Sequence, residues 1–231
     1  MKTIQETDKG FICDIQSPCF QTLTAEEIEL VRESKTQVLF RKGDSLAKQG
    51  AFASYVLFIV KGIARQYVED NSSKNYNLKI IQPGEFVGLS TVFKNKIFNY
   101  SAIALTDCQA FLIEKEAVTK IVKQNGNFGF NLISRYCEQN ANLFDTLRKV
   151  LYKQMNGRMA DTLLYLDSLK QAEPNIFQLL TRKDLADFAN VSAENAVKLL
   201  KSFEKDGLIE LIEKDIKILN KSELSELSKK G

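Results

Sequence analysis

The chain of 231 residues contains no histidine. Without histidine there can be no Ser-His or Cys-His nucleophile, no histidine-ligated zinc ion and no histidine-ligated haem. No Walker-type or GxGxxG phosphate-binding loop occurs in the chain either. The commonest parts of an enzyme are therefore missing. We expect a protein that is not an enzyme and that holds no metal and no cofactor.

Long apolar runs are also absent. No run approaches the roughly 18 residues that a membrane span needs, and the N-terminal sequence MKTIQETDKGF is polar and unlike a signal peptide. The four cysteines have irregular spacing, which is not typical of a disulfide framework. We expect a soluble, cytoplasmic protein with no membrane partner.

The excess of positive charge is small. The net charge of the whole chain is +3, a weak indication of a polyanionic partner. Residues 158–231, however, hold 12 Lys and Arg against 13 Asp and Glu, a net charge of −1. Any nucleic-acid site must therefore come from the local placement of charges.

The first half of the chain is rich in short β-type runs. A capping box at Thr24–Glu27 begins a short helix. Seven runs separated by turn signals then extend from Thr36 to Glu114: TQVLF, SYVLFIV, IARQYVE, YNLKII, EFVG, YSAIAL and QAFLI. Many short, closely spaced strands favour a β-roll or a barrel-like sandwich.

After Glu114 the pattern becomes helical. A short helix leads to Asn125-Gly126-Asn127, and a long helical stretch then runs to about Met155. Within it, residues recur at alternating steps of four and three, the a/d spacing of a coiled coil: Ile133, Cys137, Asn140, Phe144, Leu147 and Leu151. A single polar Asn in such a seam fixes register. We expect homodimerisation through this helix; the alternative is a helix packed in the core of a monomer.

Residues 156–231 have the pattern of a second helical unit. The stretch LTRKDLADFANVSAENAVKLLKSFEK, residues 180–205, indicates two short helices joined by a tight turn at Asn190. Leu185, Ala186 and Ala189 form the inner face of the first helix. The predicted apolar stripe of the second is Val197, Leu199, Leu200 and Phe203.

This spacing is typical of a helix-turn-helix, whose second helix enters the DNA major groove, although an ordinary helical hairpin has the same spacing. The runs 208–212 and 216–219, which flank a turn, predict a hairpin directly after the second helix, and such a hairpin is a wing.

The order of these motifs resembles the Crp/Fnr family of bacterial transcription regulators. The motifs are KGDxL and PGEFVG turns in a β-roll, a long dimer helix, NGRMADTLLYL, and a winged helix-turn-helix. The resemblance covers about residues 20–220. It implies an α+β fold: a cyclic-nucleotide-binding-like sensor roll at 1–124, a dimerisation helix at 125–155 and a winged helix-turn-helix at 156–231. It also implies a homodimer that binds double-stranded DNA at a pseudo-palindromic site.

Recognition residues follow from the resemblance one by one. The family's recognition helix often reads R-E-x-x-x-R after its Ser, and these positions here are Ala193, Glu194 and Lys198. Glu194 can accept from a cytosine amine and Lys198 can donate to a guanine, whereas Ala193 can contact only a thymine methyl. Asn195 could reach an adenine edge. The remaining predicted DNA contacts are to phosphates, which position the protein without specifying sequence: Thr181, Arg182, Ser192 and Lys201.

The effector site departs from the family's cyclic-nucleotide pattern. Members that bind cyclic nucleotides have Glu after the cassette Gly and later Arg-Ser-Ala. Here Gly88 is followed by Leu89 and Ser90, and the later triplet begins Tyr100-Ser101. The charges that hold the ribose and the phosphate are therefore missing, and we expect no tight binding of cyclic AMP.

The predicted effector cavity would be lined by apolar side chains. Its predicted members beyond the cassette are Val92, Phe93 and the dimer-helix residues Leu143 and Phe144. Two alternatives follow. The cavity is either filled by its own side chains, which we favour because apolar residues pointing into a roll are usually core, or it takes an apolar small-molecule effector.

An iron–sulfur cluster is not expected. A four-iron cluster needs four thiolates. Cys13 and Cys19 are spaced C-x5-C, but the position three before Cys13 is Gly10, and the later family cysteine aligns with Phe111, near Cys108. We expect these thiols to be small buried hydrophobes.

The sequence thus predicts a dimeric, sequence-specific transcription regulator with a degenerate cyclic-nucleotide-type sensor. RNA polymerase is expected as a further partner. The alternative is a cyclic-nucleotide-type regulatory module that controls a partner protein. The missing phosphate-binding residues and the complete winged helix-turn-helix count against it.

Overall fold

The computed structural model describes residues 2–3, 20–70, 74–93, 96–169 and 175–230. The chain divides into two compact units. Met1–Lys74 and Lys79–Asn142 form the first, and Asn75–Leu78 and Leu143–Gly231 form the second. The division falls within a single long helix, α3 (Gly126–Tyr152).

Two sheets lie in the first unit, apart from residues 75–78 at the start of one strand. The five-stranded sheet has the order β1-β2-β9-β4-β7, and the four-stranded sheet has the order β3-β8-β5-β6. Their strands are β1 (Lys2–Thr3), β2 (Lys35–Phe40), β3 (Ser45–Ala47), β4 (Tyr55–Lys61), β5 (Ala64–Glu69), β6 (Asn75–Ile81), β7 (Phe86–Val87), β8 (Ser101–Ala104) and β9 (Cys108–Glu114). The seven predicted runs are confirmed with small shifts at their ends, and β1 and β3 were not predicted.

The five-stranded sheet separates two apolar clusters. Because successive side chains of a strand point to opposite faces, Leu57 and Ile59 of β4 join one cluster, which we call the roll interior. Val56 and Phe58 join the other, which we call the helix-side cluster. Both clusters are almost completely buried.

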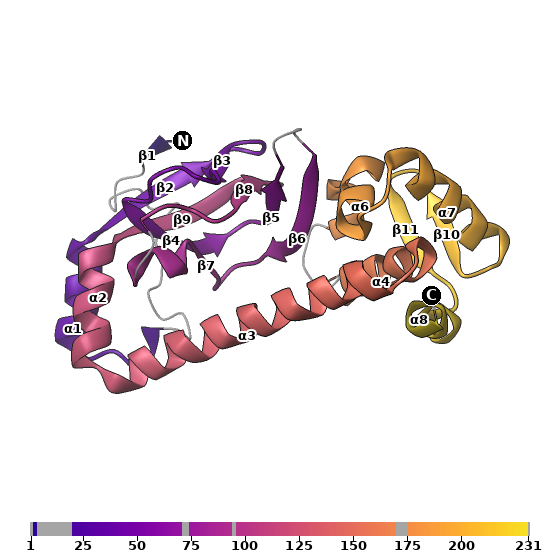
Figure 1. Ribbon diagram of the computed structural model, residues 1–231. Helices are drawn as coiled ribbons and strands as arrows, with labels where there is room; N and C mark the ends of the chain where they lie inside the picture. The colour runs from indigo at the N-terminus through magenta and orange to yellow at the C-terminus, as the bar shows by residue number, and fades with distance from the viewer. Residues whose placement is uncertain (1, 4–19, 71–73, 94–95, 170–174, 231) are drawn as a thin grey trace. The chain divides into compact units, whose positions relative to one another are not determined.

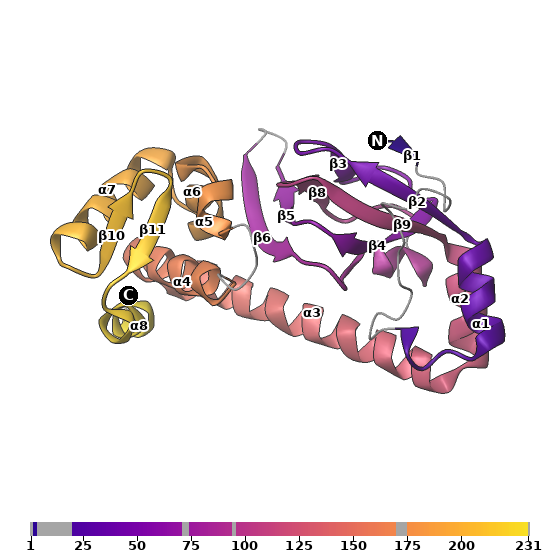
Figure 2. The ribbon, with the colours of Figure 1, turned by 180° about the vertical axis from the view of Figure 1, so that it is seen from behind.

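Two helices cover the helix-side cluster. They are α1 (Ala25–Glu33) and α2 (Lys115–Gln124), which lie side by side in Figure 1 and Figure 2. The predicted capping box is confirmed: the Thr24 hydroxyl accepts from the Glu27 N–H, and the Glu27 carboxylate accepts from the Thr24 N–H. Val31 of α1 and Val118 and Ile121 of α2 are buried in the cluster.

The second unit is mostly helical. Its elements after α3 are α4 (Met155–Ser168), α5 (Ile176–Leu179), α6 (Arg182–Ala189), α7 (Ala193–Lys205), the two-stranded sheet of β10 (Ile209–Ile212) and β11 (Asp215–Ile218), and α8 (Lys221–Lys230). The predicted helix-turn-helix and hairpin are confirmed, and the short helix α5 was not predicted. The α+β fold class is confirmed.

None of the helices in the described part of the chain combines the length and apolar character that a membrane span requires.

Candidate nucleic-acid interface and sensor site

Capping residues set the ends of both helices of the helix-turn-helix. The Thr181 hydroxyl accepts from the Asp184 N–H, and the Asp184 carboxylate accepts in turn from the Thr181 N–H, so α6 begins with a capping box. Asn190 ends α6 in the left-handed region at φ 50°, as the sequence predicted. Ser192 caps α7 by accepting from the Asn195 N–H at 3.1 Å.

The two helices pack through small and apolar side chains. Leu185, Ala186 and Ala189 of α6 are buried, as predicted. The predicted stripe of α7 is wrong in one place. The fully buried residues are Ala196, Leu200 and Phe203, with Leu199 partly buried, and Val197 is 38% exposed. A small Ala takes the contact because two closely crossing helices leave no room for a branched side chain.

The outer face of α7 carries most of the predicted base-reading residues. Ala193, Glu194, Lys198 and Lys201 are exposed, as is the capping Ser192. Lys198 Nζ lies 2.6 Å from the Glu194 carboxylate, one helical turn apart, with both side chains largely in solvent. Exposed pairs of this kind contribute only about 0.3–0.5 kcal/mol. Both groups are therefore available to another partner at little cost.

Val197 lies on this same face, because positions three and four apart are neighbours on a helix. It is three residues from Glu194 and four from Ala193. Sequence reasoning placed Val197 in the core. Its exposure adds a methyl-bearing group to the predicted base-reading set.

Asn195 is not brought together with the other candidates. Its side chain is half-buried, and its amide nitrogen lies 3.6 Å from the Met155 sulfur at the start of α4. The predicted adenine contact would need this side chain to turn outward.

The two candidates on α6 lie at its N-terminus. Thr181 is exposed, but its hydroxyl also donates to the Asp184 carboxylate at 2.7 Å, so the capping box occupies it. Arg182 is partly exposed and is the first residue of the helix. A helix N-terminus presents backbone N–H groups, so this end of α6 suits a phosphate.

Arg158 is a positioning residue that sequence reasoning missed. Its guanidinium donates to the carbonyl of Lys153 at 2.6 Å, to that of Ala189 at 2.8 Å and to that of Asn190 at 3.2 Å. Lys153 lies in the break between α3 and α4, and the other two carbonyls lie at the turn of the helix-turn-helix. One side chain therefore ties the end of the long helix to that turn. The signal was present in the motif NGRMADTLLYL, which contains this arginine.

Two side-chain hydrogen bonds help to hold the hairpin against the helices. The Leu211 N–H donates to the Glu204 carboxylate of α7 at 3.1 Å. The Asn175 amide donates to the Asp215 carboxylate at 3.0 Å. The exposed side chains of Lys214 and Lys217 lie on the hairpin. Its position directly after α7 is that of a wing.

In the first unit, the cassette position of the predicted effector site is closed by aromatic side chains. Gly88 has φ 82°, and a Cβ on it would lie 2.6 Å from the Phe98 ring. The Gly88 N–H donates to the Tyr100 hydroxyl at 2.8 Å. Burial raises the pKa of Tyr100 to about 12, so this hydroxyl is neutral. Phe98 and Tyr100 belong to the roll interior.

A carboxylate is hydrogen-bonded to Ser101, the residue that follows Tyr100. Ser101 is fully buried, and its hydroxyl donates to Glu69 at 2.6 Å. Hydrogen bonds from Lys48 and then from Ser101 lower the pKa of Glu69, which is therefore ionised at neutral pH. Lys48 Nζ lies 2.6 Å from the carboxylate.

Leu89 does not line the roll interior. It is 3% exposed in the helix-side cluster, and Val92 packs against that cluster too. The expectation that these two share a cavity with Tyr100 is wrong, because the 3-10 turn η3 (Leu89–Val92) turns them to the other side of the sheet. Ser90 lies in the same turn and is partly exposed. Leu143 and Phe144 are 48% and 65% exposed on α3.

The predicted dimer seam forms an exposed face of α3. Its four apolar members are more than half exposed, from 54% for Leu147 to 65% for Phe144, and Cys137 and Asn140 are exposed as well. Phe130, three residues before Ile133, is 70% exposed and extends the same alternation. Sequence reasoning missed it, although the spacing rule would have reached it. An exposed apolar face is typical of a contact surface.

The cysteines give no support for a metal site. Cys13 and Cys19 lie outside the described residues. Burial raises the pKa of the Cys108 thiol to about 11, so it is protonated and not a ready ligand. Within the described ranges, no group of three or more Cys, Asp or Glu side chains is arranged to hold a metal ion.

Comparison with known proteins agrees with this architecture. Residues 37–125 match the cyclic nucleotide-binding domain, and residues 157–227 match the Crp-like helix-turn-helix domain. The cAMP-activated global transcriptional regulator CRP of Salmonella typhimurium is 24% identical over 169 residues, 71% of this chain and 80% of that protein. The transcriptional regulatory protein btr of Bordetella pertussis is 22% identical over 213 residues, 89% of this chain and 86% of that protein.

A solved structure shows the same fold. A crp/fnr-family protein from Eubacterium rectale superposes with a TM-score of 0.75 at 18% identity, covering 92% of this chain and 98% of that one. The two domain matches, the two regulators and the shared fold agree with the helix-turn-helix and the roll described above. This chain belongs to the Crp/Fnr family of DNA-binding transcription regulators.

Proposed function

We propose that this regulator acts as a homodimer on a pseudo-palindromic DNA site, and that its sensor domain does not bind cyclic AMP tightly. The observation that carries the proposal is the outer face of α7. It presents Ala193, Glu194, Val197 and Lys198 together, directly before a wing. RNA polymerase is the further partner that such a regulator would meet.

The proposed reading of bases follows from the chemistry of this face. Lys198 donates to guanine O6 or N7, and Glu194 accepts from cytosine N4. Val197 and Ala193 contact thymine methyl groups, which are recognised by apolar contact and not by hydrogen bonds. Ser192, Lys201 and the N-terminal end of α6 contact phosphates, which fix the register of α7 in the groove.

Homodimerisation through α3 is supported by the seam and its exposure. Six residues at a/d spacing, extended by Phe130, lie on a face that is open in the single chain. A second copy would bury that face by knobs-into-holes packing. A two-fold dimer presents two copies of α7, and a dimer of this kind recognises two half-sites related by the same symmetry.

The proposal for the sensor rests on charge and space. A cyclic nucleotide carries a phosphodiester that needs a positively charged partner. At the cassette, the chain offers Tyr100 in place of an Arg, the Phe98 ring over Gly88, and the ionised Glu69 beside Ser101. The described aromatic side chains fill the space at Gly88, and the cation beside Ser101, Lys48, is already paired with Glu69. We propose that a small-molecule effector, if the chain uses one, is not a cyclic mononucleotide bound here.

Selection from random duplex DNA tests the DNA-binding part. The full-length protein is incubated with the pool with and without cell extract, and we expect enrichment of a palindrome in at least one condition. Failure to enrich any palindrome in either condition would sink the DNA-binding proposal and favour the alternative, a module that controls a partner protein. Calorimetry tests the sensor part: micromolar affinity for cyclic AMP would overturn it.

A further inference from the structure

A cavity in the first unit gathers four lysine side chains. Its volume is about 490 Å³, within the range of about 300–1,000 Å³ typical of ligand sites. It is lined by Thr91, Val92, Phe93, Lys96, Lys115, Glu116, Thr119, Lys120 and Lys123. We call it the lysine pocket. Its lining includes neither Gly88 nor any residue of α7.

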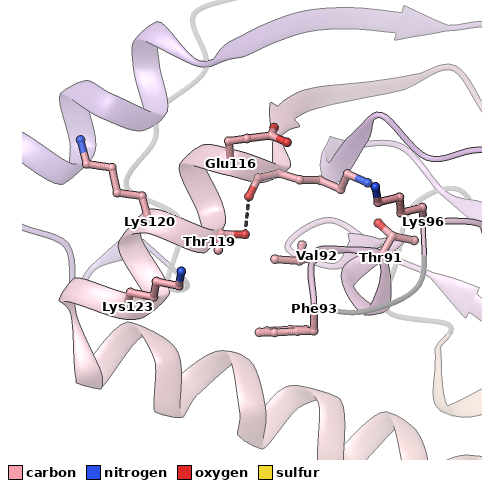
Figure 3. A pocket seen from close by; sticks show the side chains of 9 residues that line it. Thr91, Val92, Phe93, Lys96, Glu116, Thr119, Lys120 and Lys123 are labelled. Carbon is pink, nitrogen blue, oxygen red and sulfur yellow. Dashed lines mark hydrogen bonds between the residues drawn. The ribbon is translucent and has the colours of Figure 1, made fainter.

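The amphipathic character of α2 explains why the lysines gather. Ala117, Val118 and Ile121 of α2 are buried in the helix-side cluster. The opposite face therefore carries the polar residues at helical spacing, and it forms one wall of the pocket. In Figure 3, Thr119 and Lys123 lie on this wall, while Val92 and Phe93 face it from the end of η3.

The pocket has an unbalanced charge. Four of the residues that line the pocket are lysines and one, Glu116, is acidic, which gives the lining a net charge of +3. Among the described residues, none of the four lysines forms an ion pair; Lys115 Nζ lies 5.3 Å from the centre of the Phe52 ring. Like charges held in one concavity repel one another. A bound anion would relieve that repulsion as well as pair with the lysines.

The other residues that line the pocket indicate which class of anion it would bind. Val92 is half-buried and Phe93 is 52% exposed, so one side of the pocket is apolar and offers a ring face. The Thr91 hydroxyl already donates to the Gly88 carbonyl and the Thr119 hydroxyl to the Lys115 carbonyl. Recognition therefore falls to the ammonium groups, which act as point charges suited to phosphate. We propose that the lysine pocket binds a small molecule that carries a chain of phosphate groups, with Phe93 available to stack on a base.

Hydrogen bonds connect the two walls of the pocket to other elements of the first unit. The η3 wall is tied to the cassette through Thr91 and Gly88. The α2 wall ends at Asn125, whose side-chain oxygen accepts from the Phe128 N–H in the first turn of α3. A ligand that bridges the two walls would contact elements that lead both to the old cassette and to the proposed dimer helix.

The test uses the full-length protein and two probes, inorganic tripolyphosphate and ATP, titrated by calorimetry at about 0.15 M KCl, where weak surface attraction is largely screened. We expect saturable binding of at least one probe. The variant Lys96→Gln/Lys123→Gln removes one charge from each side of the pocket and should weaken binding about tenfold or more.

The control is Lys42→Gln/Lys61→Gln, which removes the same charge from exposed positions of the same unit outside the pocket. It should change the affinity less than about twofold. In Phe93→Ala, a larger loss for ATP than for tripolyphosphate supports stacking on a base. Thermal unfolding checks that each variant is folded. Absence of saturable binding by both probes, or equal weakening in the control, would overturn the proposal. Either result would leave the DNA selection unaffected.

Discussion

Because Gly88 has no Cβ, its backbone can lie in contact with both the Phe98 ring and the Tyr100 hydroxyl. The backbone lies in the left-handed region at φ 82°, the Phe98 ring covers the position where a Cβ would be, and the N–H is bound to Tyr100. Gly84 has a similar φ of 88°, but nothing lies within 4 Å of its Cβ position. Comparing substitutions at Gly84 and Gly88 therefore separates the free-energy cost of the left-handed backbone from the cost of a clash with Phe98.

We therefore predict different effects for two glycine substitutions. Gly84→Ala should lower the free energy of unfolding by about 1–2 kcal/mol, the cost of a left-handed L-residue. Gly88→Ala should lower it by about 1–3 kcal/mol more, because the new methyl overlaps Phe98. Chemical denaturation of both variants measures the difference, and equal values would show that Phe98 moves aside freely.

Lys198 and Glu194 bind each other in the isolated chain, and both are proposed to read bases. Since the pair is exposed, Lys198→Ala should change the free energy of unfolding by less than about 0.5 kcal/mol. It should weaken binding to the selected DNA site by about 1–3 kcal/mol, and only at the base that it reads. Binding curves for the selected site and for single-base variants of it give the comparison. Equal weakening on all sequences would instead make Lys198 a phosphate contact.

At the scale of elements, α3 has an exposed apolar face, which includes Ile133, Phe144 and Leu147. Leu147→Glu places a carboxylate in the proposed seam, and burying it in the dimer is strongly unfavourable. We predict that the dissociation constant of the dimer rises about 100-fold or more, as measured by sedimentation. Asn142→Glu adds the same charge to an exposed position outside the seam and should leave the dimer intact. Loss of the dimer in both variants would mean that the effect is not specific to the seam.

The junction of α3, α4 and the helix-turn-helix depends on the three bonds of Arg158. Arg158→Lys keeps the charge but loses the planar group that reaches all three carbonyls. We predict a loss of about 1–3 kcal/mol in the free energy of unfolding, because partly buried carbonyls lose charged donors. Arg148→Lys, at an arginine 72% exposed on α3, is the matched control and should cost less than about 0.5 kcal/mol. Similar losses in the two variants would contradict the role given to Arg158.

Much of the fold could be predicted from such elements because their signals are local. The Thr24–Glu27 box, Asn190 and Ser192 each act within four residues, and the structure confirms all three. Val197 was misplaced because hydrophobicity alone prefers Val to Ala at a core position. Ala196 is buried in place of Val197 because of how α6 and α7 cross, and the sequence of α7 alone does not reveal that crossing. Leu89 was misplaced for a related reason, since the turn that follows Gly88 decides which face of the sheet it reaches.

At the scale of the whole molecule, the C-terminal part that contains the helix-turn-helix carries almost no net charge. Residues 158–231 have a net charge of −1, so attraction to DNA must come from the few cations placed at the interface. We predict that Arg182→Ala weakens binding to all sequences alike. In the dimer it should reduce the slope of log affinity against log salt by about 2, one phosphate contact for each copy. Affinity measured at four salt concentrations gives the slope, and an unchanged slope would show that Arg182 does not contact a phosphate.

The packing around Gly88 also opposes the two substitutions that would introduce the family's nucleotide-binding residues, Leu89→Glu and Tyr100→Arg. Leu89→Glu would put a carboxylate into the helix-side cluster beside Phe20 and Phe86, where a buried charge is strongly unfavourable. Tyr100→Arg would take the hydroxyl partner from the Gly88 N–H while Phe98 still covered the glycine. Each change alone damages the domain before any nucleotide can bind. Neither single substitution would therefore give this domain the cyclic-nucleotide site that we propose it lacks, and any signal would have to be read by another part of the protein.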